Sequence, residues 1–151
     1  DRVELAMEMS VHGVHLGKND MNPLLARETM GAEAIIGCTA NTAADIKAFK
    51  GWDVDYVGLG PFRYTTTKEK LSPVIGLDGY AAIVNEVRAE DILLPIVAIG
   101  GITIDDIDAI MQTGVNGIAM SGAIINAPDP VAYTRQVLEK IHEAAAKYRK
   151  R

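Results

Sequence analysis

The sequence predicts an α/β protein whose parallel sheet is connected by helical crossovers. Short and mostly apolar runs recur along the chain, and each is followed by a segment with helical periodicity. Successive strands begin about 20 residues apart, with one wider gap, as strand–helix units require. We expect a single domain over residues 1–151, with five strands at residues 13–16, 34–38, 56–59, 96–99 and 117–120.

The segments between these runs carry helix start and stop signals. Asp1 and Thr42 precede two of them as side-chain caps, and Asp129-Pro130 opens the last and longest. The expected helices cover residues 2–9, 43–50, 77–88, 103–114 and 130 onward.

Two architectures accommodate this alternation. An open doubly wound sheet can be complete with five strands, and the length of 151 residues favours it, because an eight-fold barrel usually takes about 250 residues. The opening favours a barrel, because the chain starts at the cap of a helix with no strand before it. The residues alone leave both architectures open.

Composition removes several other classes. With 48% hydrophobic residues the chain is not disordered, and a single cysteine, Cys38, excludes an internal disulfide framework. A net charge of −5 argues against nucleic acid, and the basic residues 147–151 are expected only to close the last helix. The longest apolar stretch, residues 92–102, is too short and broken to span a membrane, and no signal peptide opens the chain. We expect a soluble cytoplasmic protein.

The residues that follow the strands indicate a phosphate site. Chemistry in parallel α/β folds lies at the carboxyl ends of the strands, where glycine turns expose backbone N–H groups to anions. Gly100-Gly101 and Ser121-Gly122 follow the last two strands. A tight turn explains any one of these glycines; two such turns on consecutive final strands favour phosphate binding.

The longest loop, residues 60–68, contains Thr65, Thr66, Thr67 and Lys68. A lysine among hydroxyl groups suits a phosphate or diphosphate oxygen. A solvated surface loop explains the composition equally well, but the length of the loop after a strand end favours function.

Asp1 and Asp20 are carboxylates at neighbouring strand ends, where Mg²⁺ takes one or two carboxylates together with substrate phosphates. For either residue alone, a cap or turn role is the commoner explanation. His12 and His15 lack a third ligand at metal-binding spacing, so we interpret His15 as a core or rim residue. Cys38, in an apolar strand, is interpreted as an inert thiol.

These motifs together resemble one enzyme family. The motif Gly-Val-His-Leu-Gly at residues 13–17 with Asp20, Gly-Leu-Gly-Pro at residues 58–61 before the threonine–lysine run, and residues 97–102 resemble thiamine phosphate synthase. The opening Asp1-Arg2-Val3 is similar to the end of the family's Asn-Asp-Arg motif. The resemblance implies a TIM (β/α)8 barrel, of which only the last five strand–helix units are present in the chain.

The resemblance also implies a reaction and its residues. The diphosphate of hydroxymethylpyrimidine is coupled with hydroxyethylthiazole phosphate to give thiamine phosphate and diphosphate. The implied catalytic residues are Lys68, on the diphosphate, and Thr39, which stands where the family usually has serine. The implied thiazole phosphate site comprises Thr65, Thr66, Thr67, Gly101, Ser121 and Gly122, and the implied magnesium ligands are Asp1 and Asp20.

Some positions depart from the family pattern. Tyr64 stands where proline is common, and Ser121 lies one position before the family's usual serine. The pyrimidine-binding residues of the family fall in the absent front part, so a protein that physically begins at Asp1 is expected to be inactive.

Three alternatives stay open. A thiazole tautomerase of the sister family would carry a histidine where this chain has Asn41. A non-catalytic phosphate-ligand binder would need neither Asp20 nor Lys68, and a generic sugar-phosphate barrel enzyme is the weakest alternative. In each case the expected partners are phosphorylated small molecules, with no nucleic acid or membrane, and a homodimer is left open.

Overall fold

The computed structural model describes residues 2–64 and 73–148, and its centre is a parallel five-stranded sheet. The order in the sheet is β1-β2-β3-β4-β5, so strands that are consecutive in sequence are neighbours in space. A doubly wound sheet reverses direction part-way along the strand order, and these strands do not. The strands are β1 (Gly13–Leu16), β2 (Ile35–Ala40), β3 (Tyr56–Leu59), β4 (Ile96–Ile99) and β5 (Gly117–Ala119).

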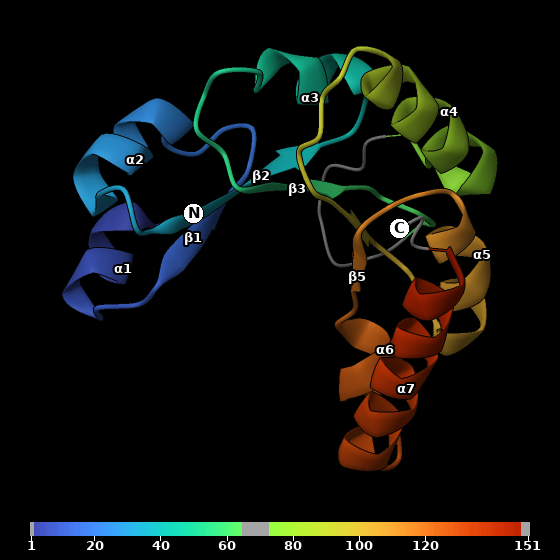
Figure 1. Ribbon diagram of the computed structural model, residues 1–151. Helices are drawn as coiled ribbons and strands as arrows, with labels where there is room; N and C mark the ends of the chain where they lie inside the picture. The colour runs from blue at the N-terminus through green and yellow to red at the C-terminus, as the bar shows by residue number, and fades with distance from the viewer. Residues whose placement is uncertain (1, 65–72, 149–151) are drawn as a thin grey trace.

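The helices follow one another in an arc along one side of the sheet, from α1 and α2 past α3 and α4 to α5 and α7 (Figure 1). Each of the four crossovers between the described strands thus returns the chain to the amino-terminal edge of the sheet, as sequential parallel strands require. The helices are α1 (Val3–Glu8), α2 (Pro23–Met30), α3 (Ala43–Ala48), α4 (Gly76–Ala89), the 3₁₀ helix η1 (Ile104–Asp106), α5 (Ile107–Gln112), α6 (Gly122–Ile125) and α7 (Pro130–Tyr148).

The predicted strands are confirmed, with corrections to the bounds of β2 and β5. The bounds of β1, β3 and β4 agree with the expectation, whereas β5 ends at Ala119 instead of residue 120. Strand β2 begins one residue late and continues through Thr39 and Ala40, because these residues pair with Gly58 and Leu59 of β3. Thr39 therefore lies in the strand itself, and its backbone is held by the sheet.

The helix caps account for most helix starts. Thr42 and Asp45 form a capping box at the start of α3, and Thr103 forms another with Asp106 before η1. Asp129 Oδ1 accepts from the N–H groups of Val131 and Ala132 at the start of α7, as predicted.

Several helix predictions need correction. The helix predicted over residues 2–9 is the shorter α1, preceded by Arg2 without a side-chain cap; Asp1, predicted as its cap, lies outside the described residues. The helix predicted over 43–50 ends at Ala48, and that over 103–114 is split into η1 and α5. Helix α4 is one residue longer at each end than the predicted 77–88. No bounds were predicted for α2, and α6 lies where a loop was expected.

The core lies between the sheet and the helices. Ile36 and Cys38 of β2 pack with Val3 of α1 and Ala26 of α2, while Val57, Leu59, Ile96 and Ala98 belong to a larger cluster with α3, α4, α5 and α7. Side chains alternate along a strand, so the residues between these face away from the helices. His15, Thr39 and Tyr56 lie on that second face, which we call the inner face.

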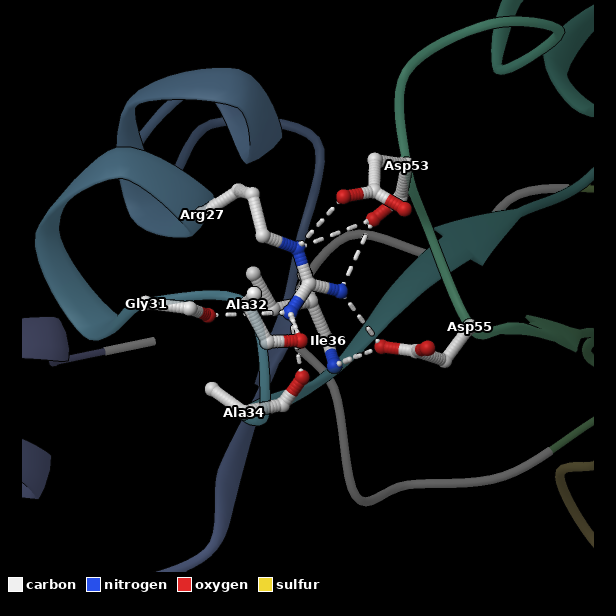
Figure 2. A network of polar contacts seen from close by, with 7 residues as sticks. All are labelled: Arg27, Gly31, Ala32, Ala34, Ile36, Asp53 and Asp55. Carbon is white, nitrogen blue, oxygen red and sulfur yellow. Dashed lines mark hydrogen bonds and ion pairs between the residues drawn. The ribbon is translucent and has the colours of Figure 1, made fainter.

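Arg27, at the end of α2, holds the amino-terminal edge of the sheet together. Its guanidinium donates to the carbonyls of Gly31, Ala32 and Ala34, at 3.1, 3.1 and 2.5 Å, where the chain runs from α2 into β2. It also donates to Asp55, just before β3, at 2.7 Å (Figure 2). Asp55 Oδ2 accepts the N–H of Ile36 as well, at 2.7 Å, so one cluster joins helix, turn and two strands.

The same arrangement recurs two strands further along. Arg88, near the end of α4, donates to the carbonyls of Ile92 and Leu94 and, at 3.0 Å, to Asn116 Oδ1. Asn116 precedes β5, and its Oδ1 accepts the N–H of Ile96 in β4 at 2.9 Å. We call the two clusters, each an arginine with its carbonyl partners and its Asp or Asn, the arginine clasps.

We predict that Arg27→Ala lowers the free energy of unfolding by about 1.5–3 kcal/mol, because the backbone carbonyls of the turn after α2 and the carboxylate of Asp55 lose their charged donor. Urea denaturation measures the loss. Arg135→Ala, at an exposed position of α7, is the matched control and is expected to stay within about 0.5 kcal/mol of the parent. Equal losses in the two variants would contradict a structural role for the clasp.

Candidate functional site

The parallel sheet gathers the predicted residues of the described chain at one edge. Asp20 follows β1, Thr39 lies near the end of β2, Gly101 follows β4, and Ser121 with Gly122 follows β5. Because all five strands run in the same direction, these positions share the carboxyl-terminal edge. The remaining predicted residues, Asp1, Thr65, Thr66, Thr67 and Lys68, lie outside the described residues.

A pocket of about 390 Å³ opens at this edge between the loop after β1 and helix α3. Asp20 and Thr39 both line it, together with Lys18, Asp45 and Trp52. Gly101, Ser121 and Gly122 stand at the same edge but outside its lining. A smaller pocket, of about 240 Å³, is formed by residues 49–54 and 91–94, which precede β3 and β4, and contains none of the predicted residues.

Asp20 has a turn role and one uncommitted oxygen. Its Oδ2 accepts the N–H of Gly17 at 2.6 Å, which fixes the turn after β1. The side chain is exposed and makes no ion pair with another described residue. No group of three or more His, Cys, Asp or Glu side chains arranged for a metal occurs within residues 2–64 and 73–148. Asp20 is thus a single carboxylate facing the pocket.

Lys18, by contrast, is already paired. Its Nζ lies 2.7 Å from Oδ2 of Asp45. Partial burial acts to raise the pKa of Asp45, but hydrogen bonds from Lys18, from the N–H of Asn41 and from Thr42 hold it below its ordinary value. This ion pair ties the loop after β1 to the start of α3 across the pocket.

A hydrogen-bonded line of three side chains crosses the inner face of the sheet. Tyr56 Oη lies 3.1 Å from Nδ1 of His15, and Nε2 of His15 lies 3.1 Å from Oγ1 of Thr39. The three residues come from β3, β1 and β2, so the line runs across strands and ends at the pocket. His15 is accordingly a polar residue of the inner face, in keeping with its interpretation as a core or rim residue.

Two glycines make this line possible. A Cβ on Gly37 would lie 2.1 Å from Cζ of Tyr56, because the tyrosine ring crosses β2 there to reach β1. A Cβ on Gly58 would lie 3.0 Å from Cε1 of His15. Sequence reasoning did not single out Tyr56, although glycines inside apolar strands mark such close approaches.

Glycine is required at positions 100 and 101 for a structural reason that does not involve phosphate. Their φ angles are +99° and +69°, and a Cβ on Gly100 would lie 2.8 Å from the backbone of Pro61. The N–H groups of Phe62 and Arg63 donate to the carbonyls of Ile99 and Gly100, so the chain after β3 lies directly on this turn. The glycines are therefore required by loop packing whether or not a phosphate binds.

Arg63 and Asp106 reinforce the same junction. The guanidinium donates to both carboxylate oxygens of Asp106, at 2.8 and 2.9 Å, and to the carbonyl of Gly101 at 2.8 Å. The hydrogen bonds from Arg63 hold the pKa of Asp106 below its ordinary value, and the hydrogen bonds from the backbone N–H and the hydroxyl of Thr103 lower it to a smaller extent. The turn after β4 and the start of the long loop after β3 are thus fixed to each other.

At the end of β5, Ser121 precedes the short helix α6 that begins at Gly122. Its side chain makes no capping hydrogen bond, and both residues are exposed. The predicted loop is thus a helical turn, with main-chain groups of the two residues at the carboxyl edge.

Cys38 is the inert thiol that the sequence predicts. It is 2% exposed, and burial raises its pKa to about 11. No thiolate is expected at neutral pH, which argues against a nucleophilic role.

Comparison with known proteins assigns the family. Residues 1–124 match the family model described as thiamine monophosphate synthase. The chain is 56% identical over 138 residues to a thiamine-phosphate synthase of Bacteroides fragilis, covering 91% of this chain and 68% of the relative. It is also 56% identical over 138 residues to the synthase of Bacteroides thetaiotaomicron, covering 91% and 66%.

A solved structure agrees. Thiamine phosphate pyrophosphorylase from Pyrococcus furiosus superposes with a TM-score of 0.80 at 33% identity, covering 95% of this chain and 66% of that one. The chain belongs to the thiamine monophosphate synthase family, and it spans about two thirds of the length of these relatives. None of the helices in the described ranges combines the length and hydrophobicity needed to cross a bilayer.

We predict that Asp106→Asn lowers the free energy of unfolding by about 1–2 kcal/mol at pH 7, because it removes a charged cap and the partner of Arg63. A carboxyl whose pKa is lowered on folding stabilises above its unfolded pKa, about 3.9, and loses that contribution as the pH falls through the lower folded pKa. Denaturation of both proteins between pH 7 and pH 2 tests this, since the difference should shrink at the acid end. A difference independent of pH would contradict the ion pair.

Proposed function

We propose that this chain forms the carboxyl-edge part of the active site of a magnesium-dependent thiamine-phosphate synthase. The observation that carries the proposal is the meeting of Asp20 and Thr39 in one pocket, in a chain that belongs to this family. We further propose that the sheet is five of the eight strands of a TIM barrel, because its strands are parallel and sequential and its helices lie on one side. A cytoplasmic location and a homodimer stay predictions.

The proposed reaction joins hydroxymethylpyrimidine diphosphate to hydroxyethylthiazole phosphate. The bond between the pyrimidine methylene carbon and the diphosphate oxygen breaks, and the diphosphate leaves with the electron pair. The lone pair of the thiazole nitrogen then forms the new bond to that carbon. Such a step needs the charge of the leaving group stabilised and the nucleophile held in line.

The residues of the pocket fit a magnesium-bound diphosphate. Asp20 offers an exposed carboxylate with one oxygen outside the turn hydrogen bond, and Mg²⁺ often takes one or two carboxylates together with phosphate oxygens and water. Asp1 is proposed as the second carboxylate, from the sequence alone. Bound there, magnesium would neutralise charge on the departing diphosphate.

The other roles belong to side chains and main-chain groups. Thr39 lines the pocket, and its hydroxyl is proposed to donate to the pyrimidine diphosphate. Lys68 is proposed to bind the same diphosphate. The threonines Thr65, Thr66 and Thr67, with the main chain of Gly101, Ser121 and Gly122, are proposed to hold the thiazole phosphate.

The tautomerase alternative is disfavoured by a specific contact. Asn41, where the sister family carries a histidine, donates through Nδ2 to the carbonyl of Gly60 at 2.6 Å. This amide ties the end of β2 to the loop after β3. It has no proton that titrates near neutral pH and is unsuited to the acid–base work of a tautomerase.

We predict that the full-length protein makes thiamine phosphate from the two substrates, whereas a protein that physically begins at Asp1 does not, and that Asp20→Asn in the full-length protein raises the magnesium concentration needed for half-maximal rate by about tenfold or more. The amide keeps the size of the side chain but loses the charge that attracts the cation. Asp53→Asn, an exposed aspartate at the opposite edge, is the control and should not change the titration. Superimposable magnesium curves for Asp20→Asn and the parent would remove Asp20 from the metal site.

We predict that Lys68→Ala slows the reaction by about tenfold or more, since a charge-assisted contact in a dry site contributes a few kcal/mol. The control is Lys50→Ala, which changes an exposed lysine that follows the carboxyl end of α3 and is not among the predicted site residues. Turnover assays under saturating magnesium decide the matter, and an unaltered rate in Lys68→Ala would exclude this lysine from the mechanism.

A further inference from the structure

The line of hydrogen bonds on the inner face has a direction that the proposed function does not use. It begins at Tyr56, near the amino-terminal end of β3, and finishes at Thr39, near the carboxyl-terminal end of β2. The register places His15, Gly37 and Tyr56 in one row across the sheet, and Thr39 and Gly58 in the next row. The line therefore climbs one row towards the pocket.

We propose that Tyr56 and His15 are positioning residues that fix the tautomer of the imidazole and thereby the hydrogen-bonding role of the Thr39 hydroxyl. The identity of the ligand that this hydroxyl would bind rests on the proposed function. The arrangement of the three side chains does not depend on it.

The three groups admit two orders of donors, and the ligand selects one. A neutral imidazole has one donor and one acceptor nitrogen. The two contacts of the imidazole are compatible with either tautomer, because tyrosine and threonine hydroxyls both donate and accept. In the proposed order the Tyr56 phenol donates to Nδ1, and Nε2 carries the imidazole proton and donates it to Thr39 Oγ1. The hydroxyl hydrogen of Thr39 is then directed to a ligand acceptor at the carboxyl-terminal edge of the sheet. A diphosphate has only acceptor oxygens, so this order of donors suits it and the reverse order does not.

Burial keeps the first donor protonated. The tyrosine hydroxyl is partly buried on the inner face, and burial together with the nearby Cys38 raises the pKa of Tyr56. The ring is also held in place, because it lies across Gly37, where any larger residue would occupy its position.

The first test needs no substrate. In protein labelled with ¹⁵N at histidine, a multiple-bond ¹H–¹⁵N spectrum at neutral pH should show His15 with Nε2 protonated and Nδ1 unprotonated. The signals of His15 are identified by their loss in His15→Gln. A proton on Nδ1, or on both nitrogens, would overturn the proposal even if the protein proves to be an active synthase.

The second test is kinetic. Tyr56→Phe removes one hydroxyl and keeps the ring, and we expect kcat to fall by about two- to tenfold, the usual effect of one hydrogen bond. The KM for the thiazole substrate should not change. Tyr148→Phe, whose hydroxyl donates to Asp108 on the helix layer, is the matched control and should retain the parental kcat. Equal rates for Tyr56→Phe and the parent would overturn the proposal.

A double-mutant cycle separates positioning from general loosening of the site. If Tyr56 acts through Thr39, then Tyr56→Phe should cause no further loss of kcat in a Thr39→Ala background. His15→Gln retains an amide donor near the position of Nε2 and should recover part of the rate lost in His15→Leu. The same factor for Tyr56→Phe in both backgrounds would show that it acts independently of Thr39, and would contradict the inference.

Discussion

The arginine clasps fix the end of the sheet where no chemistry is expected, and the arrangement of the other end depends on them. In each, a guanidinium satisfies carbonyls between a helix and its strand and binds an Asp or Asn that starts the next strand. The side-chain oxygen of that Asp or Asn also accepts one N–H group near the start of the neighbouring strand, which sets the register between β2 and β3 and between β4 and β5. The side chain of Arg27 is only 11% exposed, and its several hydrogen bonds together favour this one arrangement.

A fixed register at the amino-terminal edge determines what meets on the inner face. The row of His15, Gly37 and Tyr56 puts a glycine between two rings, so that the rings can approach across an intervening strand. A slip by one residue would turn Thr39 towards the helices and Cys38 towards the inner face. The geometry of the carboxyl-terminal edge therefore depends on contacts at the opposite end of the strands.

Much of this arrangement can be predicted from the sequence, and the exceptions have physical causes. The apolar runs predict β1, β3 and β4 to the residue, because buried strands leave a continuous signal. The end of β2 was placed too early, because Thr39 is polar yet pairs with Gly58 across the sheet. The glycines of the turn after β4 are predicted to bind phosphate, and this stays a prediction; the contacts with Pro61 and Arg63 that also require glycine there join loops distant in sequence and cannot be predicted from either loop alone. The line from Tyr56 to Thr39 depends on cross-strand register, which no single segment encodes.

The central claim is that phosphorylated ligands gather at the carboxyl-terminal edge of the sheet. An amide ¹H–¹⁵N spectrum recorded while magnesium diphosphate and then hydroxyethylthiazole phosphate are added tests it directly. The account predicts shifts for the amides of Gly17, Thr39, Gly101 and Gly122, with those of Gly31 and Gly114, at the opposite edge, unmoved. Shifts confined to the amino-terminal edge, or none at millimolar ligand, would contradict the account.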